Sequence, residues 1–207
     1  MLIVLFMSRV LKSVLWLMVV ASSLLAVACS SSSVQLDGTD EEQEYDALQR
    51  KGEWEQIVNK SQQKPLQSAA CQKVVRLAQY RLGLAGHSAL KECLADSRDV
   101  LTSPLAALMM SDVYMQLGMV NMAQRAAFEA MVKMGPETDN GRALRRLTET
   151  AVITKQYDLA LKYISLLEDN PTHRDWARSM RQVIAHPTPE YEKLQRSYEA
   201  TEDQFFM

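Results

Sequence analysis

Apolar and polar residues follow the period of an α-helix over the middle of the chain. Between residues 104 and 136, two helical stretches are separated by Gly118, and the second ends at Gly135-Pro136. In each stretch the apolar residues recur mostly at spacings of three and four, which places them on one helix face. These positions are Leu105, Leu108, Met109, Tyr114 and Leu117, then Val120, Ala123, Ala127, Ala130 and Met134. The pattern predicts a helical hairpin, and the alanines in its second helix allow close approach of the two helices.

The chain after residue 41 carries weaker copies of this pattern. Further helix pairs are predicted at residues 41–62, 66–94 and 142–168, and another helix near residues 176–184. A polar helix at residues 189–200 either caps the array or projects from it. No apolar run alternates over the length of a strand, so we expect an all-α fold without a sheet.

The predicted turns recur at a regular interval. Gly52, Gly83 and Gly118 fall 31 and 35 residues apart, and Lys155 occupies the equivalent place 37 residues later. A period in the thirties with two helices per unit is typical of a helical solenoid. The sequence therefore predicts about four degenerate repeats.

The central hairpin also matches a known repeat. The pattern of Tyr114, Gly118, Ala123, Ala130 and Pro136 resembles the tetratricopeptide repeat (TPR). Ser111 departs from it, because Gly or Ala is usual there, and the other units keep fewer signature positions. The resemblance implies a TPR-like helical-hairpin solenoid, which we assign to residues 41–185.

The N-terminal segment has the composition of an export signal. Residues 1–28 hold no acidic residue, two basic residues and an apolar run from Val14 to Ala28. Small residues before Cys29 and a serine tract after it resemble the bacterial lipoprotein signal. That resemblance implies cleavage before Cys29, lipidation of its thiol and attachment to a membrane through the lipid. The alternative is an uncleaved transmembrane anchor, although the run is shorter than the ~20 residues that a span needs.

Composition completes the division of the chain and excludes one class of partner. Residues 29–40 are expected to form a flexible tether, and residues 186–207 a C-terminal polar helix and tail. Without residues 1–28 the chain carries 21 Lys and Arg against 25 Asp and Glu. Because there is no basic excess, we expect no nucleic-acid partner.

Two cysteines remain besides Cys29. Cys71 and Cys93 fall on the two arms of one predicted hairpin, offset by roughly 6 Å along its axis. That offset fits disulfide geometry poorly, so two buried free thiols are favoured over a disulfide in an exported chain.

The sequence offers little catalytic chemistry. The three histidines, His87, His173 and His186, are widely spaced and have no cysteine or carboxylate at metal-ligand spacing. No glycine-rich phosphate loop and no GxSxG motif occur. We therefore predict no metal, no cofactor, no evident small-molecule substrate and no enzymatic activity.

Two groups of residues are candidates for binding. In TPR-like geometry Arg142 and Arg145 would face the groove where such folds hold a peptide, and arginine pairs bidentately with carboxylates. The alternative is a solvated helix face with an Arg145–Glu149 pair. A methionine cluster either forms an adaptable surface or, as its helical spacing favours, fills the core. Its members are Met109, Met110, Met115, Met119, Met122, Met131 and Met134.

A further resemblance covers most of residues 45–178. Segments 52–58, 65–78, 123–131 and 142–168, with Trp176-Ala177, are similar to the soluble C-terminal part of a family of uncharacterised Bacteroidota membrane proteins. The resemblance implies the fold and a cell-envelope location, facing the periplasm from the cell membrane or the outer membrane. Our first hypothesis is a lipid-anchored TPR-like adaptor that binds another envelope protein. The alternatives are a structural subunit of a membrane protein complex and, third, a periplasmic enzyme.

Overall fold

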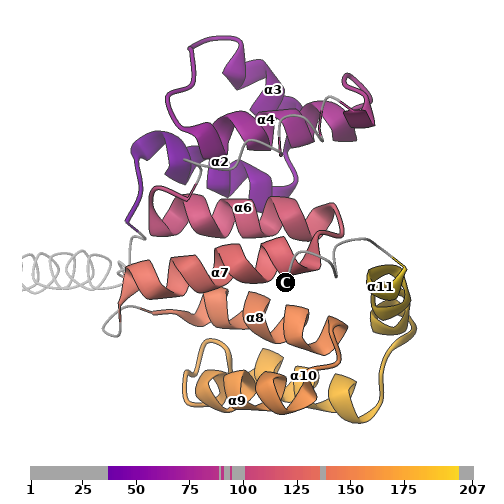
Figure 1. Ribbon diagram of the computed structural model, residues 1–207. Helices are drawn as coiled ribbons and strands as arrows, with labels where there is room; N and C mark the ends of the chain where they lie inside the picture. Colours follow the sequence, from indigo (N-terminus) through magenta and orange to yellow (C-terminus); the bar gives the residue numbers. More distant parts are fainter. Residues whose placement is uncertain (1–36, 89, 91–93, 95–100, 136–138, 201–207) are drawn as a thin grey trace, which may run out of the picture. The chain divides into compact units, whose positions relative to one another are not determined.

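The computed structural model describes residues 37–88, 90, 94, 101–135 and 139–200, and this part of the chain is helical without any strand. The expectation of an all-α protein is confirmed for these residues. In Figure 1 the hairpins α6–α7 and α8–α9 follow one another in the stack, while α2, α3 and α4 pack on the other side of α6. The helices are α2 (Asp40–Lys51), α3 (Trp54–Ser61), α4 (Ala69–Arg81), α6 (Pro104–Gln116), α7 (Val120–Met134), α8 (Gly141–Ile153), α9 (Tyr157–Glu168), α10 (Arg174–Ala185) and α11 (Pro189–Glu199).

The four turn positions that the sequence aligned share one backbone conformation. Gly52, Gly83, Gly118 and Lys155 have φ values of 73°, 72°, 75° and 60°, all in the left-handed region. Each donates its N–H to a carbonyl three residues back, and the next residue donates to a carbonyl five residues back. This is the Schellman arrangement that ends a helix with a left-handed residue. The alignment of the four turns is therefore confirmed.

Side-chain caps fix where several helices begin. Thr39 and Glu42 form a capping box at α2, and Ser103 accepts a hydrogen bond from the N–H of Ala106 at α6. The N–H of Leu105 also donates to the carbonyl of Asp37 at 3.3 Å. The predicted tether, residues 29–40, is thus too long at its C-terminal end, because residues 37–40 cap α2 and contact α6.

Helix α6 lies at the centre of the packed helices. Its residues from Pro104 to Ser111 are all buried, and it packs along α7. The hydroxyl of Ser111 donates to the carbonyl of Ala123 at 2.8 Å, and both residues are fully buried. Ser111 therefore fits the close crossing where the repeat usually has Gly or Ala, because its one polar atom is satisfied across the helix pair.

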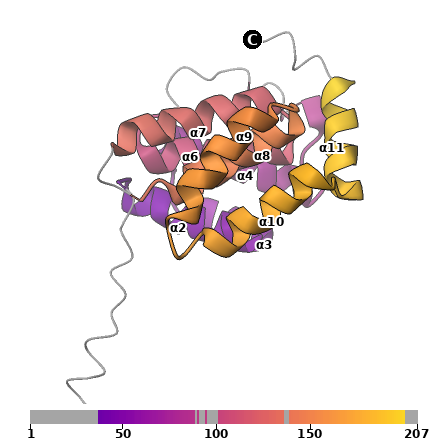
Figure 2. The same ribbon diagram turned by 90° about the horizontal axis from the view of Figure 1, so that it is seen from below.

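The C-terminal helix α11 packs on the other helices and does not project. Its Gln195 is buried and donates to the carbonyl of Val152 at 2.9 Å. The hydroxyl of Tyr198 hydrogen-bonds Asn121 of α7 at 3.2 Å, and Glu199 pairs with Lys155 at 2.6 Å. In Figures 1 and 2, α11 runs across the neighbouring helices near the α8–α9 turn. It links the turn ends of two hairpins.

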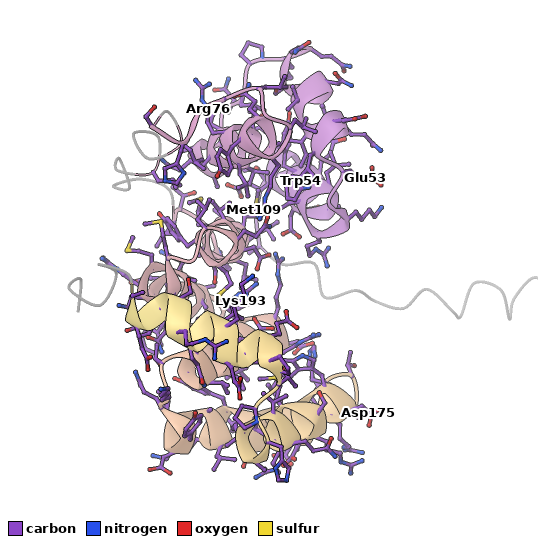
Figure 3. All side chains as sticks on the ribbon, turned by 90° about the vertical axis from the view of Figure 1, so that its right-hand side faces the viewer. Glu53, Trp54, Arg76, Met109, Asp175 and Lys193 are labelled. Atoms are coloured by element: carbon purple, nitrogen blue, oxygen red, sulfur yellow. The ribbon has the colours of Figure 1, made fainter. Side chains whose placement is uncertain are left out.

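Apolar side chains lie between the helices and charged side chains lie mostly at the surface, as expected for packed amphipathic helices. Figure 3 shows Met109 between the helices and Asp175 and Lys193 at the surface. In the methionine cluster, two members (Met109 and Met110) are buried and the other five are half-buried, so the structure supports the packing role for this cluster. Cys71 is a buried free thiol, as expected, whereas Cys93 lies outside the described residues.

The N-terminal segment, residues 1–36, lies outside the described part of the chain. The signal at residues 1–28 and the lipidation of Cys29 fall within this segment and stay predictions. Among the described helices, none has the length and apolar character needed to cross a membrane.

Candidate functional site

An open cavity of about 320 Å³ lies between α2, α6, α8 and the start of α10. Four of its lining side chains are arginines, which is a high density of positive charge for one cavity. The lining residues are Arg50, Leu108, Ser111, Asp112, Arg142, Arg145, Arg146, Glu149 and His173. We call this cavity the arginine pocket, and it includes both arginines that the sequence nominated.

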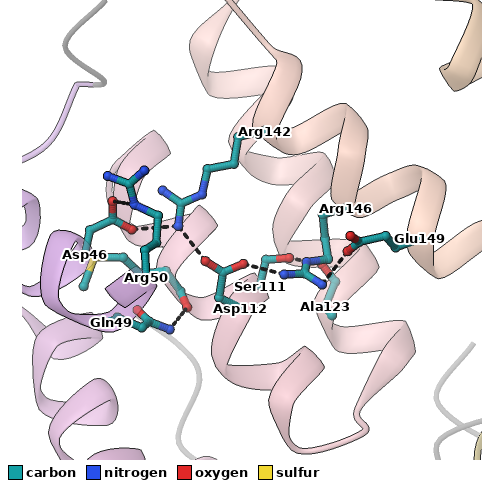
Figure 4. A network of polar contacts seen from close by, with 10 residues as sticks. Asp46, Gln49, Arg50, Ser111, Asp112, Ala123, Arg142, Arg146 and Glu149 are labelled. Atoms are coloured by element: carbon teal, nitrogen blue, oxygen red, sulfur yellow. Dashed lines mark hydrogen bonds and ion pairs between the residues drawn. The ribbon is translucent and has the colours of Figure 1, made fainter. Parts of the chain in front are cut away.

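Arg142 joins three helices at the wall of the arginine pocket. Its Nη2 lies 2.7 Å from Oδ1 of Asp46 on α2 and 2.6 Å from Oδ2 of Asp112 on α6 (Figure 4). Asp46 also accepts from Nε of Arg50 at 3.0 Å. Burial by itself lowers the pKa of Arg142, but Asp112 and Asp46 outweigh it and raise that pKa above its ordinary value. Arg142 of α8 is therefore linked to α2 and α6 by ion pairs.

Arg146 continues the same network along α8. Its Nη2 lies 2.7 Å from Asp112 and its Nη1 lies 2.6 Å from Glu149. Burial raises the pKa of the Glu149 carboxyl above its ordinary value, and Arg146 and Arg145 offset part of this rise. Arg146 thus shares the walls of the pocket with Arg142, and one aspartate, Asp112, bridges the two guanidinium groups.

Arg145 differs from its two neighbours on α8. Its guanidinium carbon stands 4.6 Å from the ring centroid of Trp176 on α10, a cation–π arrangement. It makes no ion pair with any residue of the described ranges. The expected Arg145–Glu149 pair does not form, because Glu149 pairs with Arg146 one residue further along the helix. Arg145 therefore lines the pocket with its position fixed by an aromatic ring and not by a carboxylate.

The charges around the pocket do not balance. The four lining arginines face two lining carboxylates, Asp112 and Glu149, and Asp46 adds a third through its pairs with Arg50 and Arg142. One positive charge is left over, before any protonation of His173. Because Arg145 is the lining arginine without a carboxylate partner in the described structure, the excess charge is located on its side of the pocket.

His173, the residue just before α10, also lines the pocket. A Cβ atom built on Gly141 would overlap the imidazole, so the first residue of α8 must be glycine for His173 to lie there. Its Nε2 is 3.8 Å from Asp139, while Nδ1 is buried and has no hydrogen-bond partner among the described residues. This histidine was counted in the sequence only as a poor metal ligand, and its place in the pocket was missed.

Other site chemistry is sparse in the described part of the chain. No group of three or more His, Cys, Asp or Glu side chains there is arranged to hold a metal ion. A smaller cavity of about 180 Å³ lies between α2, α3 and the segment that follows α3. Its acidic residues (Asp40, Glu41 and Glu44) and its two lysines (Lys60 and Lys64) are of mixed sign, and Lys60 pairs with Glu44. The arginine pocket therefore remains the stronger candidate.

The sequence pointed to only part of this site. Arg142 and Arg145 were found because they share one helix, but Asp46 lies 96 residues from Arg142 and Asp112 lies 30 residues from it. The Arg50–Asp46 pair was predictable from the sequence, because Arg50 stands four residues after Asp46 on the same helix. The contacts between helices depend on how the hairpins stack, which the apolar period does not determine.

Comparison with known proteins identifies a family but no activity. No curated protein matches the chain, and no solved structure matches it. The model of one family, described as "Family of unknown function (DUF6057)", matches residues 1–207, and the chain therefore belongs to this family.

Proposed function

We propose that this protein is a lipid-anchored adaptor of the bacterial cell envelope whose TPR-like repeat binds a segment of another envelope protein in the arginine pocket. One observation carries the proposal: an open pocket in which the guanidinium group of Arg145 lies over the Trp176 ring and lacks a carboxylate partner among the described residues. Arginine and aromatic side chains at a surface cavity are typical of protein recognition sites.

The TPR-like arrangement is supported by the turns. Four of them, at Gly52, Gly83, Gly118 and Lys155, have the same left-handed residue and the same pair of backbone hydrogen bonds. Successive hairpins then contact mainly their neighbours, and the first helices of separate hairpins (α2, α6 and α8) contribute to one pocket. A surface shared by several repeats is the feature that repeat proteins use to bind extended segments.

The envelope location is supported by the N-terminal composition. An apolar run, small residues before Cys29 and a serine tract after it are the elements of a lipoprotein signal. In this proposal the lipid at Cys29 holds the domain at the membrane, and the residues before Asp37 span the distance to the fold.

The test is site-specific photo-crosslinking in living cells. A photoreactive residue replaces Arg50 at the rim of the arginine pocket, and in a control chain it replaces exposed Arg125 on α7. We expect the Arg50 position to capture one envelope protein that the Arg125 position does not capture. Adding Arg145→Gln to the Arg50 chain should abolish that product, while Arg178→Gln, outside the pocket, should leave it unchanged.

Two outcomes would contradict the adaptor role. Capture that is unaffected by Arg145→Gln would place the partner on another surface. Capture of the same membrane protein from both positions would instead favour the structural subunit of a complex. Replacement of Cys29 by serine tests the anchor separately, since it should release the chain from the membrane fraction.

A further inference from the structure

The arginines of the pocket divide into two groups by their contacts. Arg142 and Arg146 each make two charged contacts at 2.6–2.7 Å with carboxylates of the protein itself. Their side chains are only 23% and 20% exposed. Because moving either arginine would take one charged partner away from each of two carboxylates at a partly buried wall, these two arginines form the frame of the pocket.

Arg145 and Arg50 form the second group. Arg145 has no ion pair in the described structure and rests on Trp176, which orders the side chain while its N–H groups remain free to donate. The Nε–H of Arg50 pairs with Asp46, and 58% of the Arg50 side chain is exposed. Both line the pocket, and both have N–H donors that no carboxylate of the described residues occupies.

We propose that the arginine pocket binds one carboxylate of an acidic side chain in an extended peptide segment, with Arg145 as the principal contact and Arg50 as the second. The inference rests on the proposed function and names the chemistry that the same site recognises. A single excess positive charge matches one carboxylate, whereas a phosphate dianion would overcompensate it. The planar set of donors on a guanidinium group held over an indole ring also suits a planar carboxylate, which accepts two parallel hydrogen bonds.

The size of the pocket agrees with this occupant. Its volume of about 320 Å³ accommodates an acidic side chain with part of its backbone. It lies at the lower end of the roughly 300–1,000 Å³ that small-molecule sites span. The pocket is open, so the rest of a peptide can continue along the neighbouring helices.

Trp176 supplies a direct readout, because a carboxylate that engages Arg145 changes the charge over the indole ring. The experiment uses the purified full chain in detergent with Trp16→Phe and Trp54→Phe, which leave Trp176 as the only tryptophan. The probe is an eight-residue peptide of alternating Ser and Glu, blocked at both ends. A peptide with Gln in place of Glu and inorganic phosphate are titrated in parallel.

We expect a saturable change in Trp176 emission with the Glu peptide and binding at least about tenfold weaker with the Gln peptide. Arg145→Gln should weaken binding of the Glu peptide by about tenfold or more, and Arg145→Lys by less, since lysine keeps the charge but loses the planar pair of donors. Arg178→Gln on α10 should have no effect, because its side chain is 65% exposed and does not line the pocket. Thermal unfolding of each variant checks that the fold is intact.

Three results would overturn the inference: equal binding of the Glu and Gln peptides, no effect of Arg145→Gln, or tighter binding of phosphate than of the Glu peptide. The last result would assign the pocket to a free anion. Failure here is distinguishable from failure of the adaptor role. If crosslinking depends on Arg145 but the Glu peptide binds no better than the Gln peptide, the adaptor role is supported and the carboxylate specificity is rejected. If the Glu peptide is preferred but no protein is crosslinked, the carboxylate specificity is supported and the adaptor role is rejected.

Discussion

At the scale of single residues, the left-handed turns are the positions where the backbone most restricts the side chain. Gly118 has φ of 75°, and a Cβ atom there would meet nothing within 4 Å. Gly118→Ala therefore tests backbone strain alone, and we expect it to destabilise the fold by about 1–2 kcal/mol. The denaturant midpoint measures this, with Gly86→Ala as the control, because Gly86 has equal space and no positive φ. Equal midpoints for the two variants would contradict the turn geometry.

Lys155 is the complementary case. It occupies the same left-handed turn position without being glycine. Lys155→Gly should relieve backbone strain and raise the unfolding midpoint, although it removes the exposed pair with Glu199. Lys155→Ala removes the same pair but keeps a Cβ atom, so it should not raise the midpoint. A higher unfolding midpoint in both variants would indicate that loss of the ion pair, and not relief of backbone strain, causes the rise.

Cys71 gives a chemical prediction at the same scale. The side chain is fully buried, and burial raises the pKa of its thiol to about 12. Relative to an ordinary cysteine with a pKa of about 8.5, the thiolate population at pH 8 falls by about a thousandfold. In a chain with Cys29→Ser and Cys93→Ser, we expect alkylation at pH 8 to be slow in the native state. It should become fast in denaturant, whereas rapid native alkylation would show that this part of the core opens easily.

At the scale of helices, the crossing of α6 and α7 is the most sensitive contact. Ala123 is fully buried and its carbonyl accepts from Ser111, so the helices have no room for a larger side chain. Ala123→Leu should overpack this crossing at a cost of about 1–3 kcal/mol. Ser197→Leu on the exposed face of α11 should change stability by no more than about 0.5 kcal/mol. Similar denaturant midpoints for the two variants would show that Ala123 is not at a helix crossing.

The helices and their turns were largely predictable because both depend on local sequence. The apolar period places the helices, and the turn glycines mark where each hairpin reverses. The predicted start of the first helix, near residue 41, is within one residue of the observed start at Asp40, where Thr39 and Glu42 form a capping box. The partners of Arg142 were not predictable, since Asp46 and Asp112 reach it only after the hairpins have stacked.

At the scale of the described domain, Arg142 connects helices that are distant in sequence. Repeat proteins are stabilised mainly by contacts between neighbouring units. Here one side chain of α8 pairs with Asp46 of α2, whose side chain is only 5% exposed. The network therefore couples the first hairpin to the fourth.

Removing the ion pairs of Arg142 should lower both the stability of the fold and the cooperativity of its unfolding. Arg142→Met keeps the length of the side chain but leaves Asp46 and Asp112 without one charged partner, and we expect a loss of about 1.5–3 kcal/mol. Arg178→Met removes only an exposed pair and should cost no more than about 0.5 kcal/mol. Urea unfolding should also become broader in Arg142→Met, as the two ends of the array uncouple. An unchanged midpoint and slope would contradict a structural role for the network.

The arginine pocket has a consequence for how the chain matures. Its walls come from Arg50 near the beginning of the folded region and from α8 and His173 much later in the chain. No fragment that ends before α8 contains the pocket, and a chain whose hairpins have not docked lacks it as well. A partner that bound there would therefore select completed molecules, and its binding free energy would add directly to the stability of those molecules.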